Sequence, residues 1–78
     1  MSTIDRRVMV RWLLRHGFLP AVPITAANIL VYKKNGVRIQ IPGQGPEKLS
    51  RDDVNLVLKK LEGLGYSRRE VRKELTGT

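Results

Sequence analysis

The chain has 78 residues with 15 Lys and Arg, 7 Asp and Glu, one His and no Cys, which gives a formal net charge of +8. This length allows a single domain, residues 1–78, and the lack of cysteine together with one histidine excludes disulfides, thiolate zinc sites, multi-histidine metal sites and thiol nucleophiles. The hydrophobic fraction of 41% is typical of a globular protein, and the sequence has no apolar run of about 20 residues and no secretory signal pattern, so we expect a cytoplasmic protein without membrane contact.

The first predicted element is a helix between Ser2 and Gly17. Ser2 and Asp5 have the spacing of a capping box, and Gly17 suits the left-handed conformation that commonly follows a helix. Helical spacing gives this segment a broad apolar side: Val8, Met9, Trp12, Leu13 and His16. Three arginines recur every four residues and so share one stripe: Arg7, Arg11 and Arg15.

Three strands are predicted to follow. Residues 18–24 are apolar, but their two prolines lack the N–H that a ladder needs, so we expect an edge strand or a strand-like loop. Residues 29–32 and 37–41 are rich in β-branched side chains, and the Asn35-Gly36 pair between them predicts a hairpin with a type I′ turn. In the second run Val37, Ile39 and Ile41 point to one side, and Arg38 and Gln40 to the other.

Two helices are predicted after a connector rich in Gly and Pro, residues 42–46. Ser50 opens the first, with Asp53 three residues later, and a core stripe follows at i, i+3, i+4 and i+7: Val54, Val57, Leu58 and Leu61. We expect this helix to end at Gly63 or Gly65. Ser67 and Glu70 cap a short last helix that docks through Val71 and Leu75.

This order predicts an α+β domain with two layers, α-β-β-β-α, and a short extra C-terminal helix. If the helices cover the face with Val37, Ile39 and Ile41, the opposite face meets water or a partner. Both apolar pairs of the neighbouring strand, Ile29/Val31 and Leu30/Tyr32, fit an exposed position, and we assign the second pair to it. The predicted partner-binding face is therefore Leu30, Tyr32, Arg38 and Gln40. A dimer contact, or cover by the last helix, would explain the same pattern.

We find no catalytic constellation and expect no cofactor. His16 is the only imidazole, and at the end of a helix it suits a structural role, where a cation interacts favourably with the helix dipole. The serines and the paired aspartates have capping positions, and Glu70 and Glu74 lie among basic residues with which they can pair.

The positive charge is uneven and indicates a polyanionic partner. Residues 1–20 and 21–42 each have a net charge of +3, residues 43–66 are neutral, and residues 67–78 add +2. The predicted nucleic-acid-binding residues are Arg7, Arg11, Arg15, Lys33, Lys34 and Arg38. A solvated basic surface is the simpler alternative.

Three segments together resemble the HicA-type toxins. They are Trp12-Leu13-Leu14-Arg15-His16-Gly17-Phe18, Val37-Arg38-Ile39-Gln40-Ile41-Pro42, and residues 49–67 with Val57-Leu58-Lys59-Lys60-Leu61 and Gly65-Tyr66-Ser67. The resemblance spans nearly the whole chain in the same order. It implies a double-stranded-RNA-binding-like fold, mRNA endoribonuclease activity and a HicB antitoxin as partner.

The chain departs from that family where it matters for cleavage. The family's essential histidine belongs to a Gly-Ser-His motif, whose place is taken here by Thr25-Ala26-Ala27-Asn28. The histidine position falls on Ala27 or Asn28, and neither side chain can act as a general acid or base. We therefore expect a catalytically inactive RNA-binding module. The alternatives are a module of phage or toxin–antitoxin origin that binds an acidic protein, and an active ribonuclease that uses His16 or another site.

Overall fold

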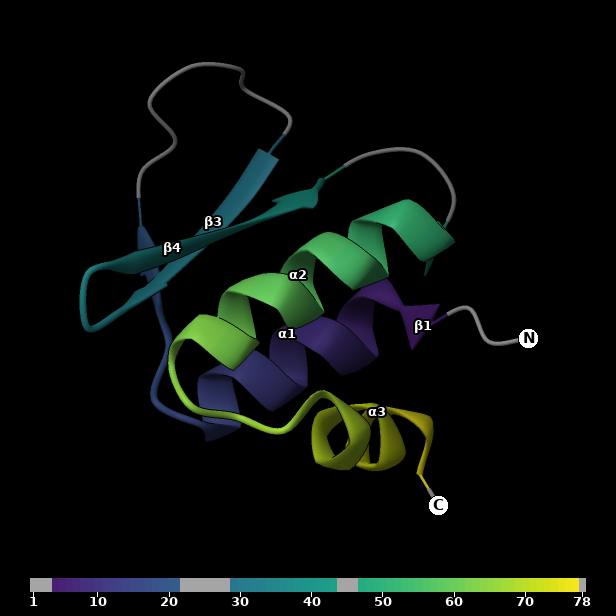
Figure 1. Ribbon diagram of the computed structural model, residues 1–78. Helices are drawn as coiled ribbons and strands as arrows, with labels where there is room; N and C mark the ends of the chain where they lie inside the picture. Colours follow the sequence, from purple (N-terminus) through teal and green to yellow (C-terminus); the bar gives the residue numbers. More distant parts are fainter. Residues whose placement is uncertain (1–3, 22–28, 44–46, 78) are drawn as a thin grey trace.

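The computed structural model describes residues 4–21, 29–43 and 47–77 (Figure 1). The elements in chain order are β1 (Ile4–Asp5), α1 (Arg6–Arg15), β2 (Leu19–Ala21), β3 (Ile29–Lys34), β4 (Val37–Pro42), β5 (Lys48–Leu49), α2 (Arg51–Gly63) and α3 (Arg68–Thr76).

An antiparallel sheet of three strands forms one side of the molecule, with β3 between β2 and β4. The predicted hairpin is confirmed: Asn35 and Gly36 both have positive φ, 50° and 81°, as a type I′ turn requires. The predicted edge strand is confirmed for Leu19–Ala21, and residues 22–24 of that prediction lie outside the described residues.

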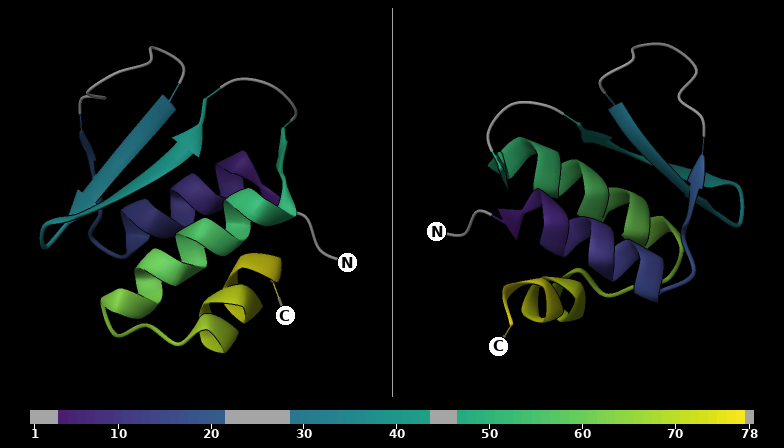
Figure 2. Two further views of the ribbon diagram at one scale, coloured as in Figure 1. Left: turned by 45° about the horizontal axis from the view of Figure 1, so that its top comes forward. Right: turned by 180° about the vertical axis from the view of Figure 1, so that it is seen from behind.

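The helices form the other side. α1 and α2 run next to each other beneath one face of the sheet, and α3 lies against them on the side away from the sheet (Figures 1 and 2). The predicted α+β architecture, α-β-β-β-α with an additional C-terminal helix, is thus confirmed. Because α3 packs on the helices, it does not cover the open face of the sheet. No helix within the described ranges combines the length and apolar character needed to cross a bilayer.

The start of α1 differs from the prediction. Ile4 and Asp5 form a short strand that pairs antiparallel with Leu49 and Lys48 of β5, so the helix begins at Arg6. Asp5 takes the N-cap position but makes no side-chain capping bond, and Ser2 lies outside the described residues. The β1–β5 pair brings the starts of α1 and α2 together, which explains why the two helices run in the same direction.

The other helix ends agree with the sequence. Ser50 Oγ accepts a hydrogen bond from the Asp53 N–H at 3.1 Å, and Ser67 Oγ accepts one from the Glu70 N–H at 3.4 Å. α1 ends at Arg15 with His16 as its C-cap, and Gly17 follows with a φ of 89°, which lets the Phe18 N–H reach the carbonyl oxygen of Leu13 at 3.0 Å.

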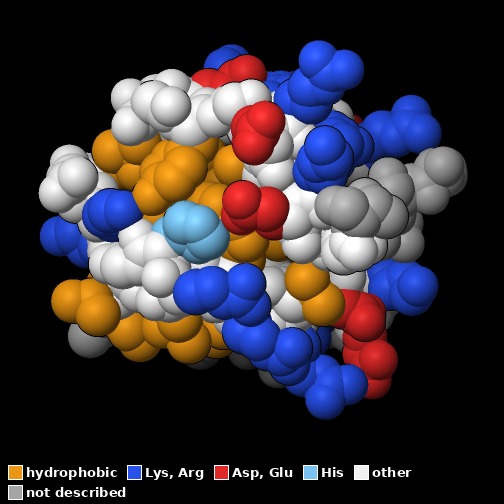
Figure 3. All heavy atoms as spheres, turned by 90° about the horizontal axis from the view of Figure 1, so that it is seen from below, with side chains coloured by type: hydrophobic (Ala, Val, Ile, Leu, Met, Phe, Trp, Pro, Cys, Tyr) orange, Lys and Arg blue, Asp and Glu red, His pale blue; other side chains and the backbone are white. Residues whose placement is uncertain are grey.

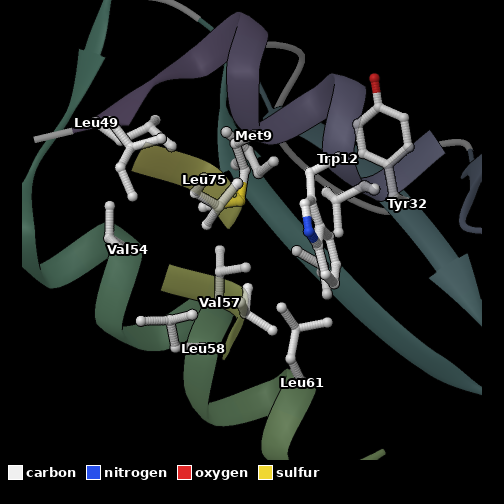
Figure 4. Close-up of a cluster of buried hydrophobic side chains, with 14 of the residues drawn as sticks. Met9, Trp12, Tyr32, Leu49, Val54, Val57, Leu58, Leu61 and Leu75 are labelled. Atoms are coloured by element: carbon white, nitrogen blue, oxygen red, sulfur yellow. The ribbon is translucent and has the colours of Figure 1, made fainter. Parts of the chain in front are cut away.

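One hydrophobic core fills the space between the sheet and the helices (Figure 4). Its buried residues come from every element except β2: Ile4, Met9, Trp12, Leu13, Phe18, Tyr32, Ile39, Ile41, Leu49, Val54, Val57, Leu58, Leu61, Val71 and Leu75. Every residue of the core stripes predicted for α2 and α3 belongs to this core. Trp12 of α1 belongs to this core and also donates a hydrogen bond to Glu74 of α3, so it connects the core to the surface described next.

Candidate nucleic-acid interface

The arginine stripe on α1 is exposed as predicted. Arg7, Arg11 and Arg15 all lie on the solvent side of the helix, and α1 contains no acidic residue. Within the described part of the chain, none of the three makes a salt bridge. Arginines at i and i+4 repel each other, so the helix gains nothing from this arrangement on its own. The stripe is therefore an unneutralised line of positive charge.

A groove of about 330 Å³ runs beside this stripe, between α1 and α3. Arg11 and Arg15 lie along one wall, and Glu74 and Leu75 along the other. Figure 3 shows a diagonal band of Lys and Arg side chains next to the histidine, with further basic side chains across the same face. This face can hold an extended polyanion along α1.

Lys34 does not belong to this surface. Register places it opposite Val37, on the helix side of the sheet, while Lys33 lies opposite Arg38 on the other side. Its Nζ donates to the carbonyl oxygen of His16 and to the hydroxyl of Tyr66, both at 2.7 Å. These two bonds give Lys34 a structural role, and its predicted role in phosphate binding stays a prediction.

The six predicted basic residues therefore fall into three groups. The α1 arginines lie on the helical side, Lys34 lies between the hairpin and the end of α1, and Lys33 and Arg38 lie on the far face of the sheet. Arg38 also lines a groove that the hairpin shares with α2, so its long side chain reaches the edge of the sheet next to that helix.

The assignment of Leu30 and Tyr32 to the open face is wrong. Directly opposite residues of antiparallel strands point to the same side, and these two pair with Ile41 and Ile39, which face the helices. Tyr32 is a buried member of the core. Register places Ile29 and Val31 on the side of Arg38 and Gln40 instead. Val31 is nevertheless only 4% exposed and Leu30 is 36% exposed, so the side of the sheet does not by itself decide exposure on β3. Sequence could not decide this, because both pairs are apolar.

His16 belongs to a network that joins α1, β3 and α3. Its ring stacks on Trp12 with centroids 3.8 Å apart, and its Nδ1 lies 2.9 Å from the Trp12 carbonyl oxygen. Because a carbonyl only accepts, Nδ1 carries the hydrogen and Nε2 faces Glu74 Oε1 at 3.6 Å. The same Oε1 accepts from Trp12 Nε1 at 2.7 Å. Tyr66 closes the cluster with edge-on contacts to both rings.

This network confirms a structural role for His16 and adds Glu74, Tyr66 and Lys34, which sequence reasoning missed as a group. Each acid–base group in it already contacts another protein group: His16 faces a carbonyl and a carboxylate, and Lys34 faces a carbonyl and a hydroxyl. Among the described residues no cluster of His, Asp or Glu has the arrangement of a metal site. Thr25-Ala26-Ala27-Asn28, the segment at the family's histidine position, lies outside the described residues.

Comparison with protein-family models, curated proteins and solved structures found no match. The resemblance to HicA-type toxins therefore stays a prediction.

Proposed function

We propose that the protein binds RNA through the arginine stripe of α1. The main support is that Arg7, Arg11 and Arg15 share one exposed side of a helix that contains no acidic residue. Their spacing of four residues corresponds to about 6 Å along the helix, so three phosphates of one strand can each meet a guanidinium. The phosphates would supply the negative charge that the helix itself lacks.

The stripe favours recognition of the backbone over recognition of bases. Within the described ranges the α1 side offers guanidiniums and aliphatic side chains, while the Trp12 ring is 3% exposed and the partly exposed His16 ring already stacks on it. The stripe itself therefore offers guanidiniums for phosphates and no ring of its own for a base. Binding by shape, phosphate and 2′-hydroxyl is how proteins recognise duplex RNA, and we expect a duplex to bind better than a single strand.

Salt-dependent binding tests this proposal. Anisotropy of a labelled 20-base-pair RNA, measured between 50 and 300 mM salt, should give a slope of log affinity against log salt of roughly −2 to −3, because three phosphate contacts release about 0.7–0.9 counterions each. The variant Arg7→Gln/Arg11→Gln/Arg15→Gln should lose most of the affinity and of the slope.

A charge-matched control separates a specific surface from net charge. Lys48→Gln/Lys59→Gln/Lys60→Gln removes the same charge from exposed positions on β5 and α2. It should weaken binding far less than the arginine variant. Equal loss in the two variants, or no RNA binding at 50 mM salt, would contradict the proposal.

Ribonuclease activity at His16 has less support, because both ring nitrogens face protein groups. Incubation of mRNA with the wild-type chain and with His16→Ala should give the same absence of products. Cleavage by the wild type that the variant loses would establish an enzyme instead.

A further inference from the structure

A groove of about 650 Å³ between the hairpin tip and α2 has no part in the proposed RNA surface. Its lining comes from β4, the turn before it and α2, and includes no residue of α1: Gly36, Val37, Arg38, Leu56, Lys59, Lys60 and Gly63. All of these residues belong to the described ranges. The lining combines an apolar floor with three cations and no acidic side chain.

The α2 side of the groove is a second organised face of that helix. Leu56, Lys59, Lys60 and Gly63 follow i, i+3, i+4 and i+7, next to the stripe that faces the core. Leu56 is 62% exposed, although it is a large apolar side chain in the middle of a helix. Val37 lies across from it on β4, so an apolar strip is bordered by basic residues on both sides.

Gly63 keeps the groove open at its end. A Cβ added there would meet no atom within 4 Å, and the residue is helical, so the backbone does not require glycine. The left-handed residue that ends α2 is Gly65, with φ of 100°. A glycine in a helix lowers its stability relative to alanine. Glycine at position 63 thus leaves the groove open at a cost in helix stability.

We propose that this groove docks an acidic segment of a partner protein that carries a leucine- or phenylalanine-type side chain. The apolar side chain would lie between Leu56 and Val37, and flanking Asp or Glu would pair with Lys59, Lys60 and Arg38. A second copy of this chain fits poorly, since each copy has a net charge of +8. RNA fits less well than a peptide, because the apolar strip of Leu56 and Val37 lies among the cations and offers no group that a phosphate backbone can bind.

Peptide selection tests the proposal with a defined probe. A displayed library of random 12-residue peptides is panned against the wild-type chain, and the most enriched peptide is synthesised with a fluorophore for anisotropy. We expect enriched peptides to contain Leu, Phe or Trp beside at least two acidic residues. Enrichment of basic peptides, or no enrichment, would overturn the proposal.

Two variants test whether the selected peptide binds in this groove. Gly63→Leu fills the open end, and Leu56→Ser removes the apolar floor from an exposed position, so both should keep the wild-type circular dichroism spectrum and unfolding transition. Each variant should lower the affinity for the selected peptide at least tenfold. A peptide whose affinity neither variant changes binds elsewhere and would refute the groove as its site.

The experiment also separates this inference from the proposed RNA surface. The Arg7→Gln/Arg11→Gln/Arg15→Gln variant should bind the selected peptide within about twofold of wild type, whatever its effect on RNA. If Gly63→Leu instead lowered the affinity for the labelled RNA as strongly as the affinity for the peptide, the groove would be a nucleic-acid surface. The proposal of a protein partner would then be wrong.

Discussion

Lys34, on the second strand of the sheet, holds the end of the first helix: its Nζ donates a 2.7 Å hydrogen bond to the carbonyl oxygen of His16. The last carbonyls of a helix have no partner within the helix, and a cation there is favoured by the dipole. The same nitrogen also donates to Tyr66, which precedes α3. One half-buried lysine therefore fixes three segments that are far apart in the sequence.

Lys34→Met should lower the free energy of unfolding by about 1–3 kcal/mol, because it removes two hydrogen bonds from a charged donor and leaves their acceptors partly buried. Urea denaturation followed by tryptophan fluorescence measures this directly, since Trp12 lies beside the network. Lys33→Met is the matched control: its side chain is exposed on the other face, and we expect a change below about 0.5 kcal/mol. Equal effects of the two substitutions would refute the structural role of Lys34.

Glu74 should matter as a hydrogen-bond acceptor more than as a charge. Glu74→Ala leaves the Trp12 indole N–H without its acceptor and should cost about 1 kcal/mol, whereas Glu74→Gln keeps an acceptor oxygen and should cost clearly less. Thermal unfolding of the three proteins in one buffer gives the comparison. A Gln variant as unstable as the Ala variant would show that the hydrogen bond contributes nothing.

Arg11, a member of the proposed RNA surface, should reduce the stability of the fold. It has an arginine one turn before it and another one turn after it, so Arg11→Gln removes two like-charge contacts and should raise stability by about 0.5 kcal/mol at low salt. The gain should shrink at 1 M salt, where the Debye length falls to about 3 Å. If 1 M salt left the gain in stability unchanged, its cause would be the helix propensity of the new residue and not the removal of charge repulsion.

Two neighbouring glycines should respond in opposite directions to alanine. Gly63 is helical with open space around it, so Gly63→Ala should stabilise the protein by about 0.5 kcal/mol. Gly65 has φ of 100°, so Gly65→Ala should destabilise it by about 1 kcal/mol or more. Chemical denaturation of both variants checks the pair, and a loss of stability in Gly63→Ala would mean that this position has a constraint the backbone does not reveal.

Elements with local signals were predictable from sequence. Asn35-Gly36 determines its own turn by the positive φ that both residues tolerate, and Ser50 and Ser67 cap the helices they precede. The stripe of Arg7, Arg11 and Arg15 followed from helical spacing alone. In each case the physical cause lies within a few residues of the feature.

Features that depend on distant partners were not predictable. The two-residue strands β1 and β5 are too short to show a period. They depend on the pairing of Ile4 with Leu49, which are 45 positions apart and both buried in the core. Lys33 and Lys34 are the same residue type in the same run, and only the register of the strand separates an exposed cation from a structural one. Glu74 could not be connected with Trp12, since 62 positions separate them.

That separation also constrains the order of folding. The first helix contributes its tryptophan to a site that α3 completes, so α1 cannot reach its final packing until α3 has been made. Contacts of such long sequence range slow folding, because the intervening chain must be ordered before they form. During synthesis, the arginine stripe of α1 would therefore be present before the hydrogen bond between Trp12 and Glu74 can form.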